Sequence, residues 1–485
     1  MPAPTNIGTT MRRHSGGAMR ITCLAVALGV LAVGACNLPN DPNLNGPSVT
    51  DYSTITNLAQ VQNLASGVVR GDRVHAENEI IEGEVIGRDA FVLTSSETRW
   101  ESELLGPSID PSGFLGIRVF PYEVIRLTNI GLHGVSAAPF SVLSAPQKAA
   151  TLGYLQTIKA LEYLRAIETR DTAGAPLFAD VDPLASLAPL SCKHDVLNYI
   201  AAVLDSAADS LGAGGTSFPF ALPDGFAGFD TPASFLTFNR GLAAKTYVYL
   251  AFRSYPAVPD LAALNSADAA LTGSFMSTTA SLDSGPAHNY STSSGDATNT
   301  LFDADTSSTT YHANPRVRSE ADASDQRVAR KTALSKPVPA GGESSNIVLL
   351  LYLSPTAPTK ILTNKELVLL KAEVEWGLGN LTGPGSALEF ANVIRTTDGG
   401  LLADNTSTTS DEVLNRILYE KRYSLLWQSA DRWIDARQFG KLTGANPPAG
   451  IGQELGANPL GNLPIPQNEK NALGGNLTKQ CTSGP

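Results

Sequence analysis

The chain has 485 residues, enough for one large domain or two, and its composition of 42% hydrophobic and 17% charged residues is ordinary for a globular protein. Its formal net charge of −11 argues against nucleic acid or an anionic membrane surface as a binding partner. The acidity therefore indicates solubility more than any class of ligand.

Residues 1–35 are typical of a lipoprotein signal peptide. Three arginines precede an apolar run at 21–33, and small residues then lead up to Cys36. A basic segment, a short apolar segment and a small-residue cleavage site form a secretory signal. The residues before Cys36 resemble a lipobox, which predicts lipidation of Cys36 and a membrane anchor without a transmembrane helix. The alternative is an ordinary signal peptide with a chance cysteine.

The next segment, residues 36–50, is rich in Asn and Pro and predicts a flexible tether. No later stretch of the sequence is apolar for long enough to span a membrane. With Cys23 in the signal and Cys36 as the lipidation site, Cys192 and Cys481 remain. In an exported protein these two can form a disulfide, although the sequence does not show the distance between them.

The first predicted helix is at 51–69, where apolar residues recur at helical spacing. Residues 77–108 are less periodic and predict an irregular segment. Within it, Trp100 lies in the polar run SSETRWESE, so its flat apolar ring is the first candidate for stacking on a sugar, with Arg99 or Glu101 bonding hydroxyl groups. The alternative is that Trp100 packs against the adjoining helices.

Further amphipathic segments predict helices that come in pairs, as in tetratricopeptide-like units, which bury apolar surface only by stacking. No clean 34-residue period is present. The predicted helical segments are 121–135, 147–179 with its exit turn, 194–211, 239–253, 364–377 and 387–395.

The segment 254–345 is the largest insertion and is rich in Ser, Thr, Ala, Asp and Gly. Long loops of this kind are either functional or disordered, and we expect a functional one. Tyr290, Tyr311 and His312 are aromatic residues in this polar sequence, which makes them candidate ligand-binding residues. The alternative for a histidine among turns is that it is simply solvated.

Residues 419–440, YEKRYSLLWQSADRWIDARQFG, predict an amphipathic helix that stops at a glycine. Acidic and basic residues alternate along it. Charges near a packed face must be paired, so structural ion pairs are the first interpretation and contact with a ligand is the second. The candidate ion-pair residues are Glu420, Arg422, Arg432, Asp435 and Arg437.

This segment resembles the C-terminal signature of the SusD/RagB family, which are nutrient-binding lipoproteins of the bacterial outer membrane. The matching residues are Glu420, Arg432, Trp433, Asp435 and Arg437. Gln428 stands where an acid is usual, and the spacing is one residue longer than the commonest form. The P-I-P-x-x-E segment at 464–469 resembles the other signature of the family.

The resemblance covers most of residues 36–475. It implies a mostly α, SusD-like fold at 51–475 in which helix pairs at about 118–253 and 361–440 form a scaffold with long loops on one face, followed by a tail at 476–485. In family members a loop region between the first helices contributes to the ligand surface. Arg88 and Asp89, which lie in the same segment as Trp100, are therefore also candidate ligand-binding residues.

The resemblance also implies a binding protein without enzymatic activity or cofactor. It would capture an oligosaccharide or other nutrient and deliver it to a TonB-dependent, SusC-like outer-membrane transporter, as a lipid-anchored protein of the cell surface. The residues after Cys36 lack the acidic cluster expected of a surface-export signal, so the sequence leaves the orientation open. The alternative function is a tetratricopeptide-like scaffold that binds a protein or peptide.

No sequence motif indicates other chemistry. A phosphate-binding loop, a zinc protease motif, a nucleophile elbow and Cys/His metal spacing are all absent from the sequence, and six scattered histidines suggest no metal site. Glu373 and Glu375 are two residues apart on a predicted helix, so they point to different faces. Glycoside hydrolysis needs two carboxyl groups that converge on one bond, and the sequence does not support such a pair.

Overall fold

The computed structural model describes residues 52–116, 121–177, 188–303, 310–442 and 459–482. The predicted signal peptide, the lipidation candidate Cys36 and the tether lie outside these residues. Among the helices that are described, none is both long enough and apolar enough to cross a bilayer.

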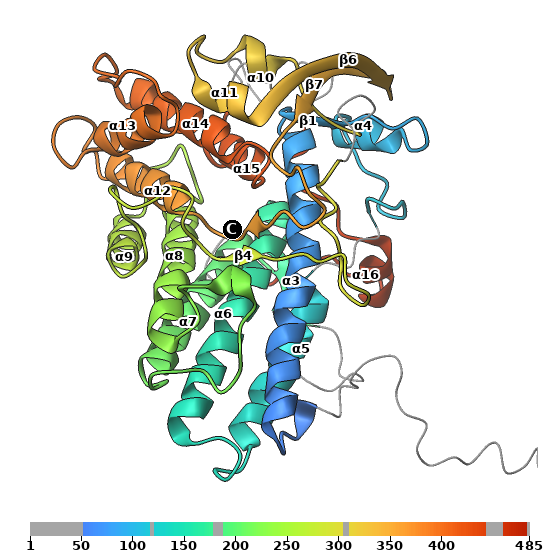
Figure 1. Cartoon of the computed structure of the whole chain (residues 1–485), viewed down its shortest axis with the longest axis vertical. Coiled ribbons are helices and arrows are strands. Elements are labelled where there is room, and N and C mark those ends of the chain that lie inside the picture. The colour runs from blue at the N-terminus through green and yellow to red at the C-terminus, as the bar shows by residue number, and fades with distance from the viewer. Residues whose placement is uncertain (1–51, 117–120, 178–187, 304–309, 443–458, 483–485) are drawn as a thin grey trace, which may run out of the picture. The chain divides into compact units, whose positions relative to one another are not determined.

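The first group of helices packs mostly in chain order, each against the next (Figure 1). Gly153 lies where α6 crosses α7, and a Cβ there would come within 2.7 Å of the side chain of Leu211, so this position needs a residue without a side chain. The helices are α3 (Leu58–Ile86), α5 (Tyr122–Ala137), α6 (Ala145–Arg170), α7 (Lys193–Gly212), α8 (Pro232–Ala251) and α9 (Leu261–Thr272).

The second group of helices follows the long insertion and packs on the first group through α8, α9 and α3. Thr409 begins α14 with a capping box, because its hydroxyl accepts from the N–H of Glu412 while the Glu412 carboxylate accepts from the N–H of Thr409. The helices are α12 (Asn364–Gly377), α13 (Ala387–Thr397), α14 (Ser410–Leu425), α15 (Asp431–Gln438) and the short α16 (Gln467–Ala472).

A small antiparallel sheet lies beside α4 (Arg99–Leu104) in Figure 1. Its strand order is β1-β5-β7-β6, so segments far apart in the sequence pair with one another, as Val92 does with Tyr311. The strands are β1 (Ala90–Val92), β5 (Tyr311–Ala313), β6 (Thr332–Ala340) and β7 (Glu343–Leu349).

Several shorter elements complete the described fold. Two two-stranded pairs are β2 (Ala175–Pro176) with β3 (Leu190–Ser191) and β4 (Ala287–His288) with β8 (Thr359–Lys360). The remaining short helices are α10 (Arg316–Ser319), α11 (Gln326–Lys331) and the 3₁₀ turns Asp171–Ala173 and Asp224–Phe226.

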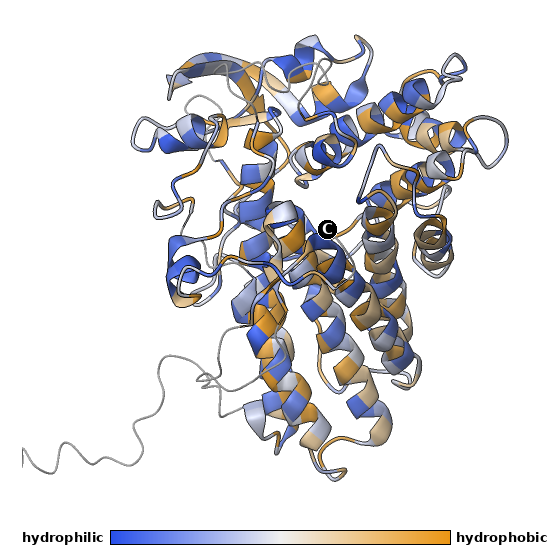
Figure 2. Cartoon of the chain, turned by 180° about the vertical axis from the view of Figure 1, so that it is seen from behind, coloured by the Kyte–Doolittle hydropathy of each residue, from blue (hydrophilic) through white to orange (hydrophobic). Residues whose placement is uncertain are grey.

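One continuous apolar cluster joins the two helix groups, with Trp427 and Trp433 from the C-terminal segment fully buried in it. Figure 2 shows hydrophobic and hydrophilic residues alternating around the same helices, which is the amphipathic pattern that predicted them. The fold is mostly α, as expected.

Two sequence-based expectations about the elements are wrong, those for the first helix and for 419–440. The first helix does not stop at residue 69 but continues to Ile86. The apolar period breaks after residue 69 because polar residues of this helix face a pocket and buried ion pairs, which hid its second half in the sequence. The insertion at 254–345, expected to be rich in loops, contains α9, α10, α11 and most of the β6–β7 hairpin among its loops. The segment 419–440 forms two helices, since Trp427 adopts a left-handed backbone with φ of 60° between α14 and α15.

Candidate ligand-binding site

A pocket of about 480 Å³ lies beside Trp100, between α3, α4, α5 and α6. One face of α3 forms its floor, because residues three and four apart on a helix share a face. These floor residues are Gly71, Val74, His75, Asn78, Glu79 and Glu82. Trp100, Phe114, Val124, Arg165, Thr169 and Leu463 contribute to the walls.

Trp100 and Phe114 form an aromatic wall of this pocket. Their rings meet edge to face with centroids 5.2 Å apart, a favourable geometry for an aromatic pair. Trp100 is half-buried and the Phe114 side chain is 38% exposed. The guanidinium of Arg99 lies 4.6 Å from the centre of the Phe114 ring and forms an ion pair with Glu97. Apolar ring surface is therefore presented at the pocket with a charged group at its edge.

Helix α4, which carries Trp100, is held by the buried side chain of Arg88. Arg88 is fully buried and donates to the carbonyl of Leu105 at 2.8 Å and to that of Leu104 at 3.3 Å. These carbonyls are at the C-terminal end of α4, where helical hydrogen bonds run out. The expectation that Arg88 contacts a ligand is wrong in this structure, because its guanidinium is buried and hydrogen-bonded to backbone carbonyls at the end of α4.

The floor of the pocket contains paired charges. Arg165 donates through Nε to Asp72 at 2.6 Å and through Nη1 to Glu79 at 2.8 Å, and His75 Nδ1 lies 2.8 Å from Glu162. The pKa of Glu79 is raised to about 8, mainly by burial and also by Glu168, while Arg165 opposes the shift. Burial would also raise the pKa of Asp72, but Arg165 and His288 hold it well below its usual range.

The other candidate residues of the insertion and of β1 do not line this pocket. Asp89 is 1% exposed and accepts from Arg422 at 2.7 Å. Tyr290 is buried and its hydroxyl pairs with that of Thr359, and His312 is fully buried within β5. These three side chains are inaccessible to a surface ligand in this structure, so the expectation for them is wrong.

Tyr311 is partly buried and also lies outside the pocket lining. Its ring packs on Trp427 with centroids 5.2 Å apart, which makes it part of the apolar core. Of the seven predicted ligand-binding residues, Trp100 lines the pocket and Arg99 lies at its aromatic wall.

Several solved structures share this fold. A SusD superfamily protein from Bacteroides fragilis matches with 17% identity over 86% of this chain and 95% of its own, with a TM-score of 0.60. Surface glycan-binding protein A from Bacteroides uniformis matches with 16% identity over 85% and 97%, with a TM-score of 0.64. A laminarin-binding SusD-like protein matches with 16% identity over 89% and 100%, with a TM-score of 0.63.

The chain has a SusD-like fold. This confirms the fold that the signature residues implied. A scan against protein-family models finds no match, and a search of curated proteins finds none either.

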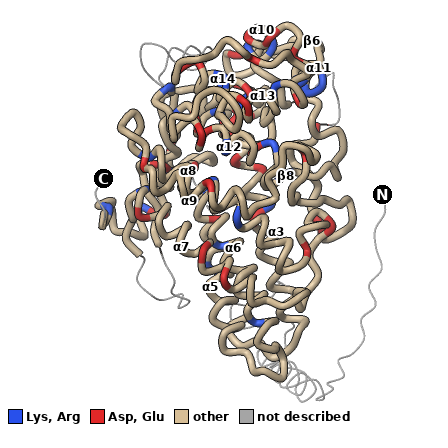
Figure 3. The backbone as a smooth tube through the Cα atoms, turned by 90° about the vertical axis from the view of Figure 1, so that its left-hand side faces the viewer, with Lys and Arg blue, Asp and Glu red and all other residues tan. Residues whose placement is uncertain are grey.

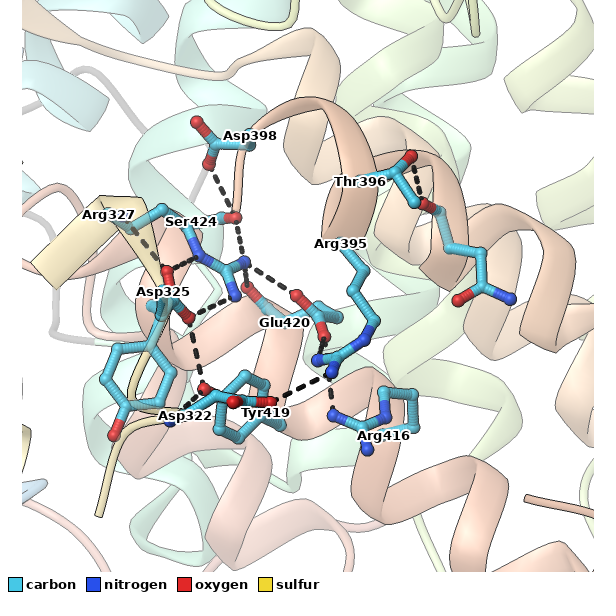
Figure 4. Close-up of polar contacts among 12 residues, drawn as sticks. Asp322, Asp325, Arg327, Arg395, Thr396, Asp398, Arg416, Tyr419, Glu420 and Ser424 are labelled. Atoms are coloured by element: carbon cyan, nitrogen blue, oxygen red, sulfur yellow. Dashed lines mark hydrogen bonds and ion pairs between the residues drawn. The ribbon is translucent and has the colours of Figure 1, made fainter. Parts of the chain in front are cut away.

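In this SusD-like fold, the five charged residues predicted as ion pairs all contact oppositely charged residues of other elements or loops. Glu420 forms an ion pair with Arg327 at 2.7 Å and accepts a hydrogen bond from Arg395 at 3.1 Å, as Figure 4 shows. The other pairs are Arg422 with Asp89 and Glu320, Arg432 with Asp89, Asp435 with Lys421, and Arg437 with Asp171. Figure 3 shows acidic and basic positions side by side around α13 and α14.

The structure also shows where the two remaining cysteines and the glutamates Glu373 and Glu375 of α12 lie. Cys192 and Cys481 form a disulfide that joins the start of α7 to the C-terminal tail. Glu373 is buried against Lys421, whereas Glu375 pairs with Lys371, so the two carboxylates do not converge. Across the described parts of the chain, no group of three or more His, Cys, Asp or Glu side chains could hold a metal ion.

Sequence reasoning missed the α3 face and Phe114. The residues Gly71, Val74, Asn78 and Glu82 have helical spacing. The polar residues among them break the apolar period, so the sequence pattern did not predict a helix here. Phe114 lies in the run DPSGFLG and carries the same signal as Trp100, an aromatic residue among turn-forming residues.

Proposed function

We propose that this protein binds an oligosaccharide in the pocket beside Trp100. The observation that carries the proposal is the aromatic wall of Trp100 and Phe114 beside a polar helix face in a pocket of about 480 Å³. Pockets that bind ligands combine apolar walls with a few oriented polar groups in this way. The fold is shared with a surface glycan-binding protein and a laminarin-binding protein, which supports a glycan as ligand.

The two kinds of surface suit the two faces of a sugar ring. The C–H face of a pyranose stacks on the ring of Trp100, and hydroxyl groups reach polar side chains of α3. Asn78 is partly exposed and its amide offers both donors and an acceptor. Since Nδ1 of His75 is bound to Glu162, Nε2 is the ring nitrogen for a ligand hydroxyl.

The charges of the lining favour a sugar without anionic groups. The two basic residues of the lining, Arg165 and His75, are already paired with carboxylates. Glu82 and Glu123 also line the pocket, and Glu79 keeps its proton at pH 7 because its pKa is raised to about 8. A uronic acid or sulfated sugar would meet more acidic than unsatisfied basic groups, and like charges in a partly buried site repel.

The cellular part of the proposal is delivery. With acyl chains on Cys36, the protein is held at the outer membrane and passes the oligosaccharide to a TonB-dependent, SusC-like transporter without chemical change. Support for this part comes from the lipobox-like sequence and the family signature at 419–440. Residues 51–475 then form the binding domain, and the chain before them forms the signal and the tether.

The test is a binding panel on the purified protein with laminarin, starch, chitosan and polygalacturonate. We expect a neutral glycan to bind without being cleaved, and Trp100→Ala to weaken it about tenfold, since a stacking aromatic contact contributes about 1 kcal/mol or more. Phe140→Ala is the matched control, because Phe140 is 73% exposed and lies outside the pocket lining.

Two results would contradict the proposal. One is equal binding by the wild type and Trp100→Ala. The other is no binding to any glycan together with capture of a peptide, which would favour a protein-binding scaffold. Tight binding of polygalacturonate alone would contradict the preference for uncharged sugars.

A further inference from the structure

Helix α4 carries Trp100 of the aromatic wall, but its own sequence does little to stabilise it. It has six residues, and an isolated helix of that length is unstable in water. Thr98 at its N-terminus forms no side-chain capping hydrogen bond, and the buried residues of α4 are Glu101 and Leu104. The position of this helix is therefore set by contacts with the rest of the fold.

Glu101 is the polar anchor of α4. Its side chain is fully buried, and Oε1 accepts from the backbone N–H of Val92 in β1 at 3.0 Å. Val92 in turn pairs with Tyr311 of β5. Glu101 thus fastens α4 to the edge strand of the sheet, directly after the residue whose ring forms the wall.

The tip of the β6–β7 hairpin lies on the same side chain. Gly341 and Gly342 connect Ala340 to Glu343 in a two-residue turn, and both have positive φ, at 61° and 92°. A Cβ placed on Gly341 would come within 2.8 Å of both Cβ and Oε2 of Glu101. The hairpin tip is therefore in direct contact with the anchor, and no larger residue fits there without displacing it.

We infer that Glu101 is a positioning residue, which sets the Trp100 ring at the pocket by holding α4 between β1 and the tip of the β6–β7 hairpin. One part of the inference rests on the proposed function, namely that Glu101 and the hairpin influence the affinity for the ligand. The Glu101 carboxyl itself is covered by Gly341 and does not line the pocket.

The environment of Glu101 makes this anchor sensitive to pH. The pKa of Glu101 is raised to about 7. Burial is the main cause, the N–H groups of Val92 and of Glu101 itself oppose the shift, and Glu343 of the hairpin adds a smaller increase. Oε2 has no hydrogen-bond donor among the described residues. Ionisation therefore favours hydration of the carboxylate, which requires α4 and the hairpin tip to separate.

The fluorescence of Trp100 provides the test. The chain has four tryptophans, and the other three, Trp376, Trp427 and Trp433, are 7%, 1% and 0% exposed. Quenching by acrylamide in the full protein therefore reports mainly on Trp100, and Trp100→Phe measures the remainder. We expect Glu101→Ala and Gly341→Val to increase the quenching constant about twofold or more. The same variants weaken the binding of a neutral glycan about three- to tenfold.

Ser102→Ala is the matched control, because Ser102 is exposed on the same helix. Glu101→Gln keeps an oxygen for the N–H of Val92 but cannot ionise. In the wild type, quenching should rise as the pH passes about 7, and in Glu101→Gln this rise should be at least halved, the remainder coming from Glu79 and His75 of the pocket lining. This arm decides the inference even where Glu101→Ala fails to fold.

Quenching and pH profile that are the same in the wild type, Glu101→Ala and Glu101→Gln would overturn the inference. The two proposals fail separately. If quenching changes as expected but no glycan binds, Glu101 still positions Trp100 and the ligand class is wrong. If Trp100→Ala loses glycan binding while the Glu101 variants keep wild-type quenching and affinity, the site stands and the positioning role is wrong.

Discussion

Removing the carboxylate of Glu420 should be among the most damaging single changes to the stability of this protein. Glu420 is fully buried and lies between two guanidinium groups, with 2.7 Å to Arg327 and 3.1 Å to Arg395. Figure 4 shows these side chains converging from α11, α13 and α14. Glu420→Gln preserves the volume of the side chain, so its effect reports on charge and not on a cavity.

The size of the stability loss depends on which carboxylate partners Arg327 and Arg395 retain in the variant. Arg327 is also fully buried and retains Asp325 at 2.7 Å, whereas Arg395 retains Asp322, whose side chain is 42% exposed. Breaking a buried pair by removing one partner costs about 3–5 kcal/mol, and the retained partners put the expected loss near the lower end, at about 3 kcal/mol. Burial raises the pKa of Glu420 even beside two arginines, so the expected loss reflects the arginine charges left without their partner and not a net gain from the intact pair.

The assay is urea unfolding at pH 7, followed by circular dichroism, with Asp322→Asn as the control. Asp322 belongs to the same network but is partly exposed, so its loss should cost less than about 1 kcal/mol. Equal midpoints for Glu420→Gln and the wild type, or equal losses for the two variants, would refute the reasoning from burial.

Two further predictions concern stability. Arg432→Glu places a carboxylate next to Asp89, which Arg432 Nε contacts at 3.2 Å, and should lower the free energy of unfolding by about 3 kcal/mol or more while the folded fraction keeps its glycan affinity. A stable Arg432→Glu protein that loses binding would instead show direct ligand contact. Stability should also fall as the pH rises from about 5 to 8, by about 2 kcal/mol or more. Burial raises the pKa of Glu79 to about 8 and those of Glu162 and Glu366 to about 7, so the folded state keeps protons that the unfolded state releases above its ordinary pKa near 4.5. Urea midpoints that rise over this range would show that these carboxyl groups are ionised in the folded protein.

The helices were the most predictable part of the fold. The segment 194–211 became α7 (Lys193–Gly212), and the segment at 364–377 became α12 with the same bounds. Their apolar residues face a neighbouring helix along their whole length, so the period of the sequence and the period of burial agree. Strands β1 and β5 were not predicted, because they have three residues each and too few positions to show an alternating pattern.

Of the residues that line the candidate site, the sequence predicted only Trp100. Trp100 stands out because a large apolar ring in a polar run lacks an obvious helix face to pack on. His75 and Asn78 gave no such signal, since polar residues at helical spacing are the ordinary surface of a helix. Arg88 and His312 were misassigned for the opposite reason, because polar residues near turns resemble surface residues although both are fully buried.

By itself, the sequence determines most of the helices, the resemblance of 419–440 to the SusD/RagB signature and the aromatic candidate Trp100, because amphipathic period and local composition are properties of neighbouring residues. Only the tertiary structure decides which charges form ion pairs and which residues line the pocket. Asp89 and Arg422 are 333 positions apart and meet at 2.7 Å. The pocket likewise combines α3 with Phe114 and with Leu463 near the C-terminus. Burial and pairing depend on distances between such segments, and no local pattern in the chain encodes those distances.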